Sequence, residues 1–408
     1  MQMSSVHDPL LEYRSEFPIL ETSSYFAAHT LGPVCRESLE ALRLFGEQWA
    51  TRGVRAWGDS WMALPDVVGE AIGHLMNAPK NSVNTPPHAT AAMASLLSSL
   101  DFSGTRNGIV TTDVEFPSVL QQTTAWSQYS ANVTVVKSED GLTPPLEGVL
   151  AAIDETTKLV AICHVYFRNA YILDVAAVVK RAREVGAWVC LDAYQSLGTV
   201  PLDVQALDVD FVIGGSVKWV LAGPGVGYLY VRPSILETLE PVLRGWMGHA
   251  DPFGFTPDWQ PAEGQRRFVT GTPQVPSLAA ALPGYKMVGK IGVGAIREKS
   301  LRQTQILMTH AEKLGMRIVN PKNVEARGGS VVLDVSPLAP EHASSVGHAV
   351  AATMNSRDYV LDYRVGAGIR LAPHFYTKDS ELTTVIDEMH HVIETRAFTA
   401  HLERGKVT

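Results

Sequence analysis

Two stretches of sequence decide the fold: WVCLDAYQSLGTVPLDV, residues 188–204, and FVIGGSVKWVLAGPGVGYLYV, residues 211–231. They contain three short apolar runs bounded by glycine and proline, a pattern that predicts strands buried on both faces of a sheet. The first run ends at Asp192, and the second ends in a small turn that is followed by Lys218. An acid and a lysine are therefore expected at the ends of consecutive strands.

This pair of side chains suits an enzyme that uses pyridoxal 5'-phosphate (PLP). A lysine attaches that cofactor as a Schiff base, and an acid pairs with the pyridinium nitrogen so that the ring can accept electrons. Asp192 and Lys218 are accordingly the candidate catalytic residues. Taken alone, they are explained equally well as an Asp that caps a turn and a lysine at the surface, so the rest of the chain has to decide.

The composition is that of an ordinary globular protein and argues against several kinds of partner. The 408 residues, 46% of them hydrophobic, suffice for one large and one smaller domain. A net charge of −8 without a basic run argues against nucleic acid or an anionic membrane as partner. The N-terminal stretch has no apolar signal core, so a cytoplasmic location is expected. The three cysteines lie far apart and predict core residues, so no metal site or disulfide is expected.

Strands and helices alternate through the middle of the chain. Apolar runs predict strands at residues 108–113, 133–138, 159–165 and 188–193, with helices between them. The helix before residue 188 is expected to begin at a capping Asp174 and to end at Gly186. This alternation is typical of an α/β fold with a mostly parallel sheet. In such sheets ligands bind at the carboxyl ends of the strands. Asp113, His164, Asp192 and Lys218 all fall at such ends.

Three regions are expected along the chain. Residues 61–280 are expected to form a large domain, and residues 281–408 a smaller α+β domain. The N-terminal segment 1–60 is expected to join the smaller domain. Residues 245–273 are rich in aromatic residues, proline and glycine, and they predict a functional loop because they are too many for a plain connection. A helical region is expected over residues 277–314.

A possible phosphate seat lies at PPHATAAMASLLSSL, residues 86–100. Two prolines and small residues precede a strong helix former, which places backbone N–H groups of His88, Ala89 and Thr90 at a helix N-terminus. An ordinary helix that begins with proline explains the same pattern.

Several motifs, in this order, resemble the kynureninase group of the class-V aminotransferases, which are PLP enzymes of the aspartate-aminotransferase-like fold type I. The resemblance covers roughly residues 18–390. It implies a large domain with a mostly parallel seven-stranded sheet and a smaller α+β domain. The motifs are YFAAHTLGP (25–33), GVRAWGDSWMALP (53–65), VEFPS (114–118), HVYFRNA (164–170), DAYQSLGTVPLDV (192–204), SVKWVLAGPGVGYLYV (216–231), GWMGHADPF (245–253), RRFVTGTP (266–273) and IRLAPHFY (369–376).

The resemblance also implies roles for individual residues. It makes Lys218 the lysine that attaches PLP and Asp192 the partner of the pyridine nitrogen. It makes Arg370 the group that grips the substrate carboxylate, with His29 as a further substrate contact. A planar carboxylate is best fixed by such an arginine fork. The implied cofactor contacts are Ala89, Thr90 and Ser216 around the phosphate, Phe116 stacked on the ring, Gln195 beside it, and Trp246 and Thr272 from a second subunit. Because Trp246 and Thr272 would come from a second subunit, the resemblance implies a homodimer with shared active sites.

The chain departs from the kynureninase pattern at polar positions around the ring. Val217 stands where kynureninases carry Tyr, and Val119 stands where they carry Asp. Tyr166 replaces an Asn that would reach the phenolic oxygen of PLP. Gln195 replaces a His and resembles the DxxQ motif of cysteine desulfurases. A kept scaffold with changed polar contacts indicates a changed reaction or substrate.

Three functions are compatible with this pattern. The favoured one takes an L-amino acid, removes the Cα proton with Lys218 and breaks a bond at Cβ, a carbon–sulfur bond in preference to the carbon–carbon bond of kynurenine. The second loses carbon dioxide from Cα in a decarboxylation coupled to deamination or transamination. The third, a non-catalytic scaffold, conflicts with the presence of both Lys218 and Asp192.

Overall fold

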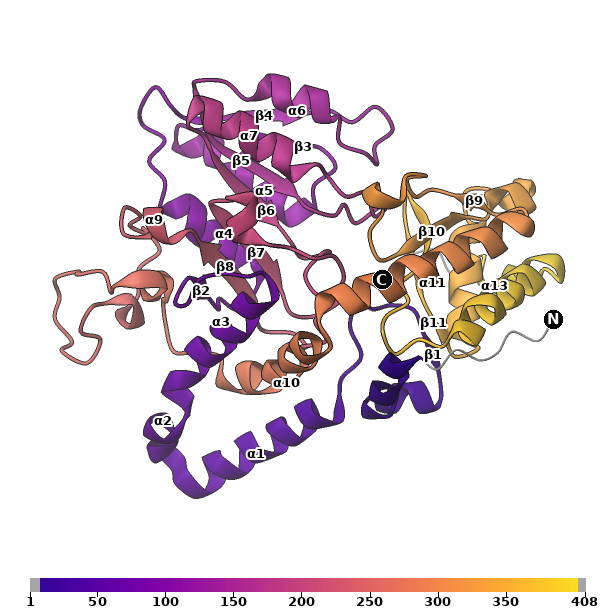
Figure 1. The fold of residues 1–408 in the computed structure, drawn as a ribbon, viewed down its shortest axis with the longest axis horizontal. Coiled ribbons are helices and arrows are strands. Elements are labelled where there is room, and N and C mark those ends of the chain that lie inside the picture. The colour runs from indigo at the N-terminus through magenta and orange to yellow at the C-terminus, as the bar shows by residue number, and fades with distance from the viewer. Residues whose placement is uncertain (1–7, 403–408) are drawn as a thin grey trace.

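A seven-stranded sheet forms the larger part of the molecule (Figure 1). The computed structural model describes residues 8–402. The strand order is β2-β8-β7-β6-β5-β3-β4. The strands are β2 (Val83–Asn84), β3 (Gly108–Thr112), β4 (Asn132–Val136), β5 (Thr157–Cys163), β6 (Trp188–Asp192), β7 (Phe211–Gly215) and β8 (Gly227–Val231). The strands from β3 to β7 run parallel, which confirms the predicted mostly parallel sheet.

The last central strand, β8, runs antiparallel to β7. Its direction follows from the connection, because residues 216–226 are too few for the helical crossover that a parallel pair needs. Gly223 and Gly225 adopt φ values of 69° and 94° in this connection and permit the sharp reversal. Lys218 therefore lies in a tight turn between two central strands.

Both faces of the sheet are buried, as the continuous apolar runs predict. Alternate residues of a strand point to opposite faces. In β6, Val189 and Leu191 pack with α7 (Val175–Val185), whereas Cys190 packs with α4 (Ala89–Ser98). The helix α7 begins at its cap Asp174 and ends before Gly186, both as predicted. The other helices near this sheet are α3 (Leu64–Leu75), α5 (Pro117–Ala125), α6 (Leu146–Ala152), α8 (Val204–Leu207) and α9 (Pro233–Leu236).

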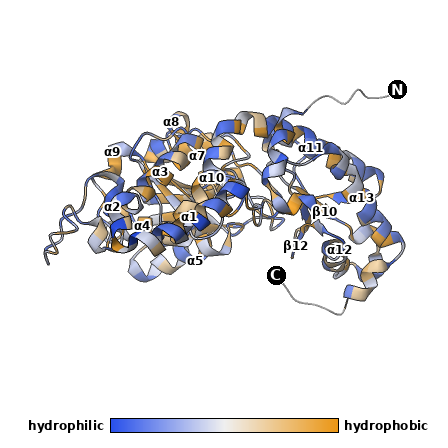
Figure 2. Ribbon diagram, turned by 90° about the horizontal axis from the view of Figure 1, so that it is seen from below, coloured by the Kyte–Doolittle hydropathy of each residue, from blue (hydrophilic) through white to orange (hydrophobic). Residues whose placement is uncertain are grey.

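A four-stranded antiparallel sheet with its own core forms the second part of the molecule (Figure 2). Its strand order is β12-β13-β10-β9. The strands are β9 (Arg317–Ile318), β10 (Val331–Asp334), β12 (Asp362–Arg364) and β13 (Gly368–Leu371), and the helices α11 (Val293–Lys313), α12 (Val346–Asn355) and α13 (Asp379–Glu394) accompany them. The helical region expected over residues 277–314 is two helices, because the chain turns between α10 (Val275–Ile291) and α11 at Gly292, where φ is 86°.

The N-terminal segment contacts both parts of the molecule. β1 (Ser24–Tyr25) pairs in parallel with β11 (Tyr359–Val360) in the C-terminal part. Farther along the segment, α1 (Arg36–Arg52) and α2 (Ala56–Asp59) extend along the outside, and α1 packs against α10. The expected domain boundaries after residues 60 and 280 stay a prediction. Within residues 8–402, every helix is too short or too polar to span a bilayer.

Candidate active site

Asp192 and Lys218 lie together at the carboxyl ends of β6 and β7. Asp192 is the last residue of β6, and the two strands are hydrogen-bonded neighbours. Lys218 Nζ lies 4.1 Å from the centroid of the Tyr194 ring and 5.5 Å from that of Phe116. The buried Asp192 accepts a hydrogen bond on Oδ1 from the Tyr194 backbone N–H at 2.8 Å. The structure thus brings the two predicted catalytic residues and the predicted stacking aromatic together.

Burial shifts the pKa values of both groups in the direction that favours their uncharged forms. Burial lowers the pKa of Lys218 to about 8; the charge of Asp192 opposes this shift, while those of Arg370 and Arg364 add to it. Burial also raises the pKa of Asp192, against the Tyr194 N–H and the charge of Lys218. A lysine with a pKa close to neutrality can act both as a nucleophile and as a base, because part of it is uncharged at working pH.

The N-terminus of α4 offers free backbone donors beside this site. The first N–H groups of a helix have no partner within the helix, so those of Ala89 and Thr90 are available to an anion. His88 caps the helix and accepts the Ala91 N–H on its ring at 3.0 Å. The helix approaches β8 closely at Gly227, where a Cβ atom would lie 2.5 Å from the backbone of His88. Glycine is therefore required at position 227 for this approach.

Ser216 and Gln195 use their side chains within the protein. The buried Ser216 hydroxyl lies 2.7 Å from the Val226 carbonyl oxygen and 2.6 Å from the Tyr285 hydroxyl. The Gln195 amide donates to the His29 carbonyl oxygen at 3.0 Å, and its oxygen accepts the Trp219 indole N–H at 3.0 Å. The side chains of Ser216 and Gln195 therefore hold the segments that carry Lys218 and His29. Direct contacts of Ser216 and Gln195 with a cofactor stay a prediction.

Arg370 and His29 meet at an acid that the sequence analysis did not single out, Asp362. The guanidinium of Arg370 is 2% exposed and donates to Asp362 through Nε at 2.6 Å and through Nη2 at 2.5 Å. His29 is buried, with Nε2 3.4 Å from Asp362 Oδ1, and burial together with Arg370 lowers its pKa to about 4. Burial would raise the pKa of Asp362, but the hydrogen bonds from Arg370 and the nearby His29 hold it well below its usual range. The predicted carboxylate fork is thus already paired with a carboxylate of the chain.

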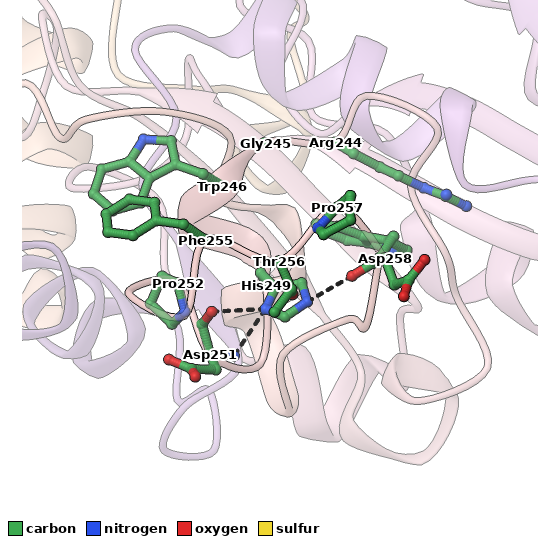
Figure 3. A pocket seen from close by; sticks show the side chains of 11 residues that line it. Arg244, Gly245, Trp246, His249, Asp251, Pro252, Phe255, Thr256, Pro257 and Asp258 are labelled. Carbon is green, nitrogen blue, oxygen red and sulfur yellow. Dashed lines mark hydrogen bonds between the residues drawn. The ribbon is translucent and has the colours of Figure 1, made fainter.

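Trp246 and Thr272 line two different cavities, and Arg244 contributes to the lining of both. Trp246 is 42% exposed and packs against Phe253 and Phe255 at one end of a cavity of about 300 Å³ (Figure 3). Hydrogen bonds to His249 hold this loop: the Asp251 N–H donates to Nδ1 at 2.9 Å, and Nε2 lies 2.9 Å from the Asp258 carbonyl oxygen. Thr272 instead lines a second cavity, which lies beside α4 of the same chain.

That second cavity has a volume of about 590 Å³. Pro86, Pro87 and Ala91 from the start of α4 line it together with residues 270–274. Thr272 is therefore close to the expected phosphate seat of its own chain. The roles predicted for Thr272 and Trp246 across a subunit boundary stay a prediction.

Glu115 is a buried acid of the site that sequence reasoning missed. It is 3% exposed, and its Oε1 accepts hydrogen bonds from Thr112 and from the Tyr166 hydroxyl, both at 2.8 Å. Burial raises its pKa to about 7, although hydrogen bonds from Cys163, Thr112 and Tyr166 oppose the shift. The sequence feature that could have identified Glu115 was its position, directly before Phe116 and shortly after the strand β3. Tyr166, which replaces the Asn that would reach the phenolic oxygen of PLP in kynureninases, thus donates to Glu115.

The residues present fit PLP. The site offers a buried acid, an amine of lowered pKa and a helix N-terminus with free N–H groups. Phe116 adds an aromatic ring that is 39% exposed and that packs edge-on against Phe167 at 5.4 Å. Groups of these kinds can supply a partner for the ring nitrogen, an attachment point, a phosphate seat and a stacking surface.

Comparison with known proteins points to the same cofactor. The family model of the class-V aminotransferases matches residues 33–354. An uncharacterized aminotransferase of Bacillus subtilis is 29% identical over 93% of this chain and 96% of its own length. A kynureninase of Deinococcus radiodurans is 31% identical over 79% of this chain and 80% of its own length. The apo cysteine desulfurase of Thermococcus onnurineus has the same fold, with a TM-score of 0.83, 21% identity and coverage of 96% of this chain and 100% of that one.

Proposed function

The chain belongs to the class-V aminotransferase family of PLP-dependent enzymes, and we propose that it expels a sulfur leaving group from Cβ of an L-amino acid. The cofactor, when bound, stabilises negative charge that develops at Cα of the substrate. In this proposal Lys218 attaches PLP, Asp192 holds the proton of the ring nitrogen, and the Ala89 and Thr90 N–H groups bind the phosphate. Phe116 packs against the ring.

Lys218 is the base in this mechanism. Its Nζ takes the proton from Cα, a role that suits an amine whose pKa is about 8. Asp192 supports the step because its buried carboxylate keeps a positive charge at the ring nitrogen. Overall, one substrate and one water give one thiol, one pyruvate and one ammonia, and the Cα proton is lost as the C–S bond breaks.

The observation that carries the proposal is that Glu115 and His29, two further titratable residues of the site, are poorly suited to activate water. Glu115 has its unpartnered oxygen, Oε2, fully buried. His29 has a pKa of about 4 and is therefore a weak base. Hydrolysis of a γ-carbonyl requires an activated water, whereas a thiolate leaves without acid help because the pKa of its thiol is near 8.5. Because Glu115 and His29 are poorly suited to activate water, the site favours elimination of a thiolate over hydrolysis.

One sequence argument for elimination has to be corrected. The resemblance placed Val119 among the changed polar positions around the ring, but it packs in the core cluster that contains Ala92, Met93 and Leu96 of α4. Its side chain therefore has no part in the polarity of the pocket. The proposal depends instead on Glu115 and His29.

Two alternatives have specific support. Carbon–carbon hydrolysis is supported by relatives that are named kynureninase, such as the one from Deinococcus radiodurans. Loss of carbon dioxide requires that Arg370 does not hold the substrate carboxylate in the ring plane. Its pairing with Asp362 meets that condition.

Product analysis separates the three reactions. The PLP-loaded enzyme is incubated with an S-substituted L-cysteine and, separately, with L-kynurenine. We expect thiol and pyruvate from the cysteine conjugate and no anthranilate from kynurenine. Anthranilate without any thiol would establish hydrolysis, and carbon dioxide without pyruvate would establish decarboxylation.

We also propose that the enzyme is a homodimer. Large apolar side chains are exposed along α1 and in the loop that contains Trp246, and such patches are typical of interaction sites. They include Leu39, Leu42, Trp49, Val54, Val242, Phe253 and Phe255. A second copy of the chain would cover these side chains.

A further inference from the structure

Tyr194 contacts both proposed catalytic residues. It lies two residues after the end of β6. Its backbone N–H donates to Asp192 Oδ1 at 2.8 Å, and Lys218 Nζ lies over its ring, 4.1 Å from the centroid. An ammonium group within about 6 Å of a ring centroid makes a cation–π contact. Tyr194 therefore connects the carboxylate of the site with the amine.

Aromatic rings provide the short-range contacts of the Lys218 amine. The second ring is that of Phe116, whose centroid lies 5.5 Å from Nζ. Within residues 8–402, Nζ donates no hydrogen bond, and no carboxylate oxygen lies within 4 Å of it. The face of an aromatic ring attracts an ammonium group through its quadrupole and has no such attraction for a neutral amine. The site therefore holds the charged form of Lys218 and leaves the neutral form free to react.

The ring of Tyr194 is held in place by the backbone of β7. Gly215 is the last residue of that strand, and a Cβ atom added to it would lie 2.5 Å from both Cζ and the hydroxyl oxygen of Tyr194. The ring therefore packs directly on the backbone, which only glycine permits. The backbone N–H of Val217 interacts with the hydroxyl group. The ring thus lies between the segment that contains Asp192 and the segment that leads to Lys218.

The other charged and titratable groups that face Lys218 come from several elements. They are Asp192 of β6, Cys163 of β5, Arg364 of β12, Arg370 of β13 and His29. Asp192 favours the ammonium form, and the two arginines oppose it. Burial raises the pKa of Tyr194 to about 12, so its hydroxyl group stays neutral at working pH. Its ring therefore stabilises the ammonium group without adding a charge to this balance.

We propose that the ring of Tyr194 is a positioning group that holds the ammonium group of Lys218 whenever this lysine is not attached to PLP. The ring keeps Nζ beside Asp192 and Phe116, the proposed partner and stacking surface of the cofactor. The inference rests on the proposed attachment of PLP to Lys218. It is independent of which bond of the substrate breaks.

The pH dependence of cofactor attachment tests this role without any turnover. The full-length enzyme is freed of PLP, PLP is added back, and the rate of attachment is followed by absorbance at a series of pH values. The midpoint of this rate reports the loss of the Lys218 proton, because only the neutral amine attaches PLP. In Tyr194→Leu the midpoint should fall by about one pH unit, since the ammonium group loses its partner. Tyr194→Phe keeps the ring face and should stay within about 0.3 unit of the unchanged enzyme.

Fluorinated phenylalanines at position 194 separate the charge of the ring face from its shape. Each added fluorine weakens the negative face with little change in size, so the midpoint should fall stepwise along the series. This series also tests the role if Tyr194→Leu fails to fold. Tyr129→Leu is the matched control, because that ring is 66% exposed and lies just before the start of β4, whereas Lys218 follows the carboxyl end of β7. Its midpoint should equal that of the unchanged enzyme.

The outcomes also separate this inference from the proposed reaction. An unchanged midpoint in Tyr194→Leu, or a fluorine series without a trend, would overturn the role of the ring. A midpoint that moves equally in Tyr194→Phe and Tyr194→Leu would overturn it as well, because the hydroxyl group would then be responsible. Shifted midpoints in an enzyme that releases no thiol from any cysteine conjugate would overturn the proposed reaction and leave the role of Tyr194 intact. Thiol release with unmoved midpoints would overturn the role of Tyr194 alone.

Discussion

At the scale of single residues, we expect Asp192 to decide whether the cofactor can act as an electron sink. The variant Asp192→Asn should still bind PLP, because the phosphate seat and Lys218 are unchanged. Its activity should fall by about two to three decades, since a neutral amide cannot hold the proton on the ring nitrogen. Turnover measured at saturating PLP tests this expectation, and a rate close to that of the unchanged enzyme would refute the pairing.

Glu115 should make stability depend on pH. Its pKa is about 7 in the folded chain and 4.5 in the unfolded chain, so the folded state binds more protons between these values. The contribution of the group to stability is therefore full below about pH 4.5 and is lost as the pH rises through about 7.

Comparison with Glu115→Gln isolates this contribution, because glutamine has the same shape and does not titrate. Between pH 4.5 and 7, the free energy of unfolding of the unchanged enzyme should fall by about 2–3 kcal/mol relative to the variant. Denaturant unfolding at a series of pH values measures the difference. Parallel curves for the two proteins would show that Glu115 titrates normally.

The sequence predicted that Asp192 and Lys218 lie together, but it did not predict the direction of the polar groups around them. Asp192 and Lys218 follow from strand ends, which the apolar runs define. The hydroxyl of Ser216 and the amide of Gln195 turn toward Val226 and His29, and these partners are distant in sequence or fixed only by packing. The pair of Asp362 and Arg370 depends on the register of β12 against β13, which no local pattern specifies.

At the scale of elements, the close approach of α4 to β8 positions the proposed phosphate seat. In Gly227→Ala the new Cβ would meet the His88 backbone at 2.5 Å, so the start of α4 must shift. We expect a stability loss of about 1–3 kcal/mol and weaker PLP binding. Thermal unfolding and PLP titration measure the two effects.

Gly294→Ala is the matched control for this substitution. Gly294 lies in α11 and has no atom within 4 Å of an added Cβ. Alanine is the better helix former there, so this variant should be as stable as the unchanged enzyme or more so. Equal PLP affinity in Gly227→Ala and Gly294→Ala would contradict the role assigned to the α4 terminus.

The helices and strands that could be predicted were those whose ends are marked in the sequence by capping residues or glycine. The helix α7 has both an Asp cap and a terminal glycine, and its bounds agree with the sequence expectation. The break at Gly292 was missed because apolar residues continue on both sides of it, and only the backbone conformation separates α10 from α11. The chain from 245 to 273 has little periodicity, and its conformation depends on contacts such as those of His249.

At the scale of the whole molecule, the exposed apolar side chains predict a dimer. Replacing Trp49 and Phe253 by Asp puts charges on these patches and should convert the dimer to a monomer. Analytical ultracentrifugation of the unchanged and substituted proteins measures the change. An unchanged enzyme that sediments as a monomer at micromolar concentration would contradict the proposal.

The central claim is that Lys218 attaches the cofactor. Borohydride reduction of the PLP-loaded enzyme, followed by peptide mass mapping, locates the attachment directly. The account predicts a reduced cofactor on the peptide that contains Lys218 and none on any peptide of Lys218→Ala. A cofactor found on another lysine, or a reducible bond that persists in Lys218→Ala, would contradict it.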